Sequence, residues 1–72
     1  MNQMINHNGL PLKIMSFLMR NRDEEVSIQD MAVKFDATYL NTQKALNRLV
    51  RAECLMARSI GNSTLYSYPE ID

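Results

Sequence analysis

The sequence of 72 residues contains no tryptophan, one cysteine, one histidine, two glycines and two prolines. A single cysteine cannot form a disulfide within the chain, so we expect a reduced, cytoplasmic protein. The sequence also lacks an uninterrupted apolar run of about 18 residues and the basic-then-apolar start of a secretory signal, so neither a membrane-spanning helix nor a signal peptide is expected. With 46% hydrophobic residues, the composition predicts a folded domain rather than a disordered chain.

The scarcity of reactive side chains argues against catalysis. A nucleophile needs a base within hydrogen-bond reach and a third group that orients the base, and nothing in the sequence pairs Cys54 with His7. These two residues also cannot supply the about four nitrogen or sulfur ligands of a zinc site, and no glycine-rich phosphate-binding loop is present. We therefore expect no enzymatic activity, no metal, no cofactor and no small-molecule ligand.

The charges are separated along the chain although the net charge is zero, with eight basic and eight acidic residues. Residues 23–36 hold five acids and one lysine. Residues 37–58 hold a single acid, Glu53, and four basic residues: Lys44, Arg48, Arg51 and Arg58. A neutral protein with this distribution can still present a basic face.

The N-terminal residues 1–9 are polar and show no hydrophobic periodicity, so we predict a mobile arm followed by a single domain over residues 10–72. Apolar residues then recur at helical spacing: Leu10, Ile14, Phe17 and Leu18. This spacing predicts a first helix over residues 11–21, with Pro11 in the first turn, where its missing N–H is not needed.

A second apolar stripe lies beside the first on this helix and consists of Leu12, Met15 and Met19. It indicates one of two arrangements. Either the helix is central to the core, or the stripe is a dimer interface.

Capping signals predict two further helices. Ser27 followed by Asp30 has the pattern of a capping box and predicts a short helix over residues 28–35. Thr38 is suited to cap a third helix over residues 39–52.

The third predicted helix has two different sides. Its apolar side carries Tyr39, Thr42, Leu46, Leu49 and Val50. Its other side is mainly polar and carries Leu40, Asn41, Lys44, Asn47, Arg48 and Arg51. An exposed helix face usually mixes both charge signs through pairs spaced by four residues, but no acid occurs between Ala37 and Ala52. This pattern favours contact with DNA.

The hydrophobic period changes from helical to alternating after residue 53. Residues 55–60 and 63–68 are expected to form a hairpin around Gly61-Asn62, since both turn residues tolerate positive φ. This turn pairs Ala57 with Tyr66 and gives the hairpin an apolar side for the helices. Val26, before the second helix, is expected to form a very short strand.

Three helices followed by a C-terminal β-hairpin make an α+β domain that resembles the winged helix-turn-helix superfamily of DNA-binding regulators. The resemblance spans residues 14–68 and rests on three runs, which are SIQDMA at 27–32, ALNRL at 45–49 and LMAR at 55–58. Size and layout are also similar to the small regulators of fimbrial operons. Glu53-Cys54 stands where this superfamily usually has a glycine after the recognition helix, and the wing tip carries no Arg or Lys.

The resemblance implies that the helix over residues 39–52 enters the major groove of DNA. The base edges would be met by Tyr39, Leu40, Asn41 and Lys44, with Asn47 on the same face. The phosphates would be met by Arg48 and Arg51 and by the hydroxyl of Thr38. The wing residues Arg58 and Asn62 would touch the DNA backbone or the minor groove.

We therefore predict a sequence-specific regulator of transcription that binds double-stranded DNA as a homodimer or beside a second regulatory protein. The alternative is a winged-helix module for protein–protein interaction that does not bind DNA. The zero net charge and the uncharged wing tip favour this alternative.

Overall fold

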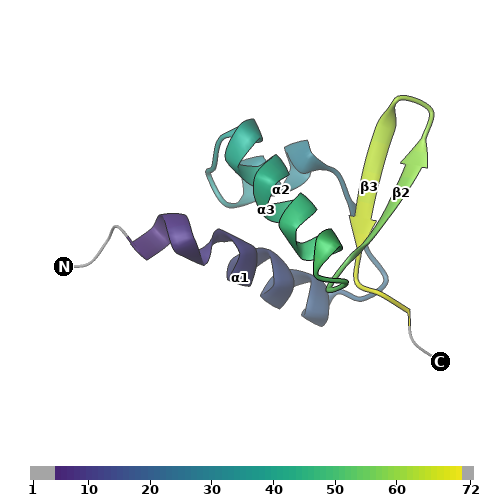
Figure 1. Ribbon diagram of the computed structural model, residues 1–72, viewed down its shortest axis with the longest axis horizontal. Coiled ribbons are helices and arrows are strands. Elements are labelled where there is room, and N and C mark those ends of the chain that lie inside the picture. Colours follow the sequence, from purple (N-terminus) through teal and green to yellow (C-terminus); the bar gives the residue numbers. More distant parts are fainter. Residues whose placement is uncertain (1–4, 71–72) are drawn as a thin grey trace.

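The computed structural model describes residues 5–70 and contains three helices followed by a C-terminal hairpin (Figure 1). In chain order the elements are α1 (Ile5–Arg20), β1 (Glu25–Val26), α2 (Ile28–Lys34), α3 (Tyr39–Arg51), β2 (Met56–Ile60) and β3 (Ser63–Ser67). The predicted α+β class, the order of the elements and the short strand at Val26 are confirmed.

Helix α1 begins at Ile5 and not near residue 11, so the predicted helix start was wrong, and residues 5–9 are not part of an arm. Residues 1–4 of the predicted arm lie outside the described residues. The error arose from Pro11, which lies inside α1 and not in its first turn. Pro11 has no N–H to donate to the carbonyl of residue 7, which weakens a helix, but its fixed φ is compatible with helical backbone. Helix α1 continues through it.

The core lies between the three helices and the inner side of the sheet. Helix α1 contributes Leu10, Ile14 and Leu18, and the other elements and the segment before β2 contribute Val26, Ile28, Met31, Ala45, Leu46, Leu49, Leu55 and Tyr66. Thr42 is a fully buried polar residue. Its hydroxyl donates a hydrogen bond of 2.8 Å to the carbonyl of Thr38, so the buried oxygen is satisfied.

The hairpin belongs to a three-stranded antiparallel sheet with the strand order β1-β3-β2. Ala57 lies opposite Tyr66, as predicted, and Tyr66 lies opposite Val26 on its other side. Gly61 adopts φ 60, which a type II′ turn requires at its first central position. The turn therefore fixes the register that brings Tyr66 onto the core.

Helices α2 and α3 begin with the predicted caps. Ser27 Oγ accepts from the N–H of Asp30 at 3.0 Å, and the Asp30 carboxylate accepts from the N–H of Ser27 at 3.0 Å, which completes the capping box. Thr38 Oγ1 accepts from the N–H of Asn41 at 3.0 Å at the start of α3.

The same two helices end in a similar way, with a residue in the left-handed region. After α3, Glu53 adopts φ 64, its N–H donates to the carbonyl of Val50, and the N–H of Cys54 donates to the carbonyl of Leu49. This pair of bonds is a Schellman motif, which usually has glycine at the position of Glu53. Asp36, with φ 53, plays the same part after α2.

Candidate nucleic-acid interface

The outer side of α3 is exposed and contains no acidic residue. We call this side the α3 surface, and it consists of Tyr39, Leu40, Asn41, Lys44, Asn47, Arg48 and Arg51. The opposite side of the helix is buried through Thr42, Ala45, Leu46 and Leu49. All predicted DNA contacts except Thr38, Arg58 and Asn62 therefore share one exposed surface.

Tyr39 belongs to this exposed surface and not to the apolar side of α3, contrary to the prediction. Its side chain is 54% exposed at the first residue of α3. Burial raises the pKa of the Tyr66 hydroxyl in β3, and the neighbouring Tyr39 raises it further.

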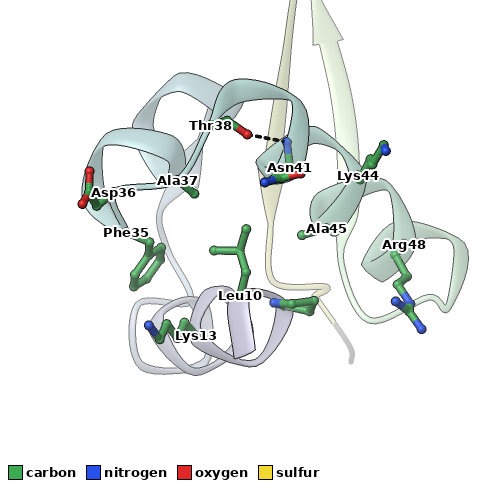
Figure 2. Close-up of a pocket in the computed structure, with 11 residues that line it drawn as sticks. Leu10, Lys13, Phe35, Asp36, Ala37, Thr38, Asn41, Lys44, Ala45 and Arg48 are labelled. Atoms are coloured by element: carbon green, nitrogen blue, oxygen red, sulfur yellow. Dashed lines mark hydrogen bonds between the residues drawn. The ribbon is translucent and has the colours of Figure 1, made fainter. Parts of the chain in front are cut away.

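An open groove of about 690 Å³ runs along the other border of the α3 surface, between α3, α1 and the turn after α2 (Figure 2). It is lined by Leu10, Pro11, Lys13, Phe35, Asp36, Ala37, Thr38, Asn41, Lys44, Ala45 and Arg48. Figure 2 shows Leu10 pointing from α1 into the groove, whereas Lys13 and Arg48 extend at its borders. The groove thus has an apolar floor and basic borders.

Lys13 is the residue that sequence reasoning missed. It belongs to α1, yet it lines the same groove as Lys44 and Arg48 of α3. These three cations face one acid in the groove, Asp36. The charge of Lys13 was visible in the sequence, but its place beside α3 depends on how α1 packs.

The hairpin contacts the α3 surface through Tyr66. Its hydroxyl donates a hydrogen bond of 3.4 Å to Oδ1 of Asn47. The bond holds the Asn47 amide from the side of the sheet and leaves its NH₂ group free to donate outward. Asn62 is exposed in the turn between β2 and β3.

Arg58, the basic residue of the wing that was predicted to contact DNA, forms an ion pair with another residue of the same protein, Glu25. Its guanidinium forms two hydrogen bonds with the Glu25 carboxylate, of 2.6 and 2.9 Å. The hydrogen bond from Arg58 lowers the pKa of the Glu25 carboxyl. The positive charge of Arg58 is therefore matched by a neighbouring negative charge.

The apolar stripe of α1 divides between the surface and the core. Leu12 and Met19 are exposed, whereas Met15 is half-buried and packs against the core. Leu12 and Met19 are therefore the two side chains of the stripe that are exposed enough to contact a second copy. A dimer interface at this stripe stays a prediction.

A solved structure from work on the DNA recognition and protein interaction domains of HOP2 and its homologous DNA pairing properties is similar to this chain. The TM-score is 0.77 at 20% sequence identity, and the match covers 85% of this chain and 100% of that chain. The fold is a winged helix. No family model matches the sequence, and no curated protein matches it.

In the winged helix, α2 and α3 form the helix-turn-helix and the hairpin of β2 and β3 forms the wing. No helix within residues 5–70 has the length and apolar character needed to cross a membrane. In the same part of the chain, no three His, Cys, Asp or Glu side chains gather where a metal ion could be held. The arrangement offers an exposed basic helix surface beside a groove.

Proposed function

We propose that the protein is a sequence-specific regulator of transcription that binds double-stranded DNA through the α3 surface. The observation that carries this proposal is the acid-free α3 surface, whose Lys44, Arg48 and Arg51 are joined by Lys13 across the groove. The similar HOP2 structure comes from work on DNA recognition, which supports the same use of the fold.

The side chains of the α3 surface suit major-groove contact. Asn41 and Asn47 are able to pair with adenine, and Lys44 with the acceptors of guanine. Leu40 is 56% exposed near the start of α3, where an apolar side chain is able to contact a thymine methyl group. Arg48 and Lys13 would then lie at the phosphates, which position the protein without specifying sequence.

The number of cations limits the affinity of one copy. Neutralising phosphates with Lys13, Lys44, Arg48 and Arg51 would release about 3–4 counterions, and non-specific Kd values are about 10⁻⁴–10⁻⁶ M at physiological salt. A single domain is therefore a weak regulator. We propose that it acts as a homodimer or beside a second protein.

Fluorescence anisotropy with random-sequence duplex DNA over a salt series tests the proposal. The wild type should bind in the micromolar range, and the slope of log K against log salt should fall by about 2 in the Lys44→Ala/Arg48→Ala variant. Glu70→Ala, an exposed change after the last strand, is the control and should leave the slope unchanged. Absence of binding at low salt, with the helices confirmed by circular dichroism, would contradict DNA binding.

A winged-helix module for protein–protein interaction is the second candidate. The large exposed side chains of Tyr39 and Leu40 at the start of α3 favour it, because exposed aromatic groups are enriched at protein interfaces. The work on HOP2 also concerns protein interaction domains. A folded protein that passes through a heparin column at low salt would support this candidate over DNA binding.

A further inference from the structure

Strand β2 is an edge strand with an open side. It pairs with β3 and with no other described strand, and all five of its residues are exposed. The strand order β1-β3-β2 places it on the side of β3 away from β1, and Figure 1 shows it on the side of β3 away from α2 and α3. Natural edge strands are usually blocked by proline, charged side chains, a bulge or very short length. The register of β2 runs without a bulge from Met56 to Ile60, the strand contains no proline, and its one charged residue, Arg58, is paired with Glu25.

The register identifies the backbone groups on the open side. Ile60 and Ser63 flank the two-residue turn and therefore form a hydrogen-bonded pair, after which such pairs alternate along the ladder. The N–H and C=O groups of Ala57 and Ser59 consequently point away from β3. Both residues have small side chains, so a further strand has access to these groups.

The sequence of β2 is self-complementary about its central residue, Arg58. In an antiparallel pair of two copies centred there, Ala57 lies opposite Ser59 of the second copy, and their outward groups form four hydrogen bonds. Met56 then lies opposite Ile60 of the second copy. Met56 and Ile60 are 50% and 47% exposed and lie on the same face of β2, so the pairing would cover apolar surface that one copy leaves in water.

We propose that β2 pairs antiparallel with β2 of a second copy and joins the two sheets into one. The arginines at the centre would be like charges opposite each other, which is unfavourable across a strand pair. Each Arg58 is instead held by its own Glu25, which lies on the far side of β3. The ion pair draws the guanidinium away from the open edge and neutralises it.

The two-fold axis of such a pair is perpendicular to the joined sheet, so the helices of both copies lie on one face of it. The contact involves one short strand from each copy, and we expect a small, reversible interface of the weak class. It does not depend on DNA binding, so it is tested without DNA.

Sedimentation equilibrium over a protein concentration series measures the dimerisation constant. Ser59→Pro removes an N–H on the open side, at a position where an edge strand tolerates proline, and should weaken dimerisation by at least about tenfold. Ser59→Ala keeps the N–H and should dimerise like the wild type. Circular dichroism of both variants checks that the fold is kept.

A charge exchange tests the register independently of backbone changes. Ile60→Lys should weaken the dimer, and adding Met56→Glu should recover part of the loss, because the carboxylate introduced at position 56 would then lie opposite the ammonium introduced at position 60 of the second copy. A monomeric wild type throughout the series would overturn the proposal. So would a dimer that Ser59→Pro and Ile60→Lys leave unchanged, or one that Leu12→Ser/Met19→Ser on α1 abolishes.

Discussion

Arg58 of β2 holds the carboxylate of Glu25 in β1 although the two strands do not pair with each other. The Arg58 side chain crosses β3 and forms hydrogen bonds of 2.6 Å from Nη2 to Oε1 and 2.9 Å from Nε to Oε2. A bidentate pair of this kind fixes both side chains in one geometry. It joins the short strand before α2 to the wing.

The ion pair predicts how the carboxyl of Glu25 titrates. Its folded pKa is lowered, so the pair stabilises the fold above the unfolded pKa of 4.5, and this contribution is lost as the pH falls through the lower folded pKa. In Arg58→Met, the pKa of Glu25 measured by NMR should rise. Arg22→Met, which removes a cation that lies over Tyr68, serves as the control and should leave it unchanged. An unaltered Glu25 pKa in Arg58→Met would show that the pair does not form in solution.

Lys13→Ala should weaken DNA binding even though the residue lies on α1. Its cation lines the groove with Lys44 and Arg48, so its loss should reduce the salt slope of binding by about 1. Arg20→Ala removes an exposed cation from the same helix outside the groove and is the matched control. If the salt slope of DNA binding falls by the same amount in both variants, the net charge of the protein and not the groove determines affinity.

Glu53→Gly should stabilise the domain. Glu53 adopts φ 64 after α3, a conformation that glycine adopts without the steric cost of a Cβ atom. We expect the free energy of unfolding in urea to rise by about 1 kcal/mol. Glu53→Ala removes the charge but keeps the Cβ atom. An equal gain in Glu53→Ala would attribute the effect to charge and not to backbone conformation.

Tyr66 should make stability depend on alkaline pH. Burial raises its folded pKa above that of the unfolded chain, so its contribution is present below the unfolded pKa of about 10 and is lost as the pH rises above that value. Spectrophotometric titration of tyrosinate should show a late step in the wild type that Tyr66→Phe lacks. Tyr68→Phe, which keeps Tyr66, should retain that step.

The features that were predicted correctly from the sequence are those determined by residues close together in the chain. Ser27 and Asp30 are three residues apart and form their capping box within one helical turn. Gly61 sets the turn, and the turn sets the register that pairs Ala57 with Tyr66. The amphipathic pattern of residues 39–52 likewise separated most of the buried side of α3 from its exposed side.

The features that sequence reasoning missed depend on contacts between distant elements. The place of Lys13 on the groove that Lys44 also lines, the Glu25–Arg58 pair and the bond from Tyr66 to Asn47 all follow from how helices and strands pack. No local pattern marks such partners. The start of α1 was missed for another reason, because a proline inside a helix has the same local signature as one in the first turn.

The strand order has a consequence for synthesis of the protein on the ribosome. Val26 of β1 emerges before α2 and α3, but its partner Tyr66 belongs to the last strand. A nascent chain that carries all three helices still lacks the residue that completes both the sheet and the core. Because this pairing joins residues far apart in sequence, it closes late in folding. The native domain therefore forms only after β3 has left the exit tunnel.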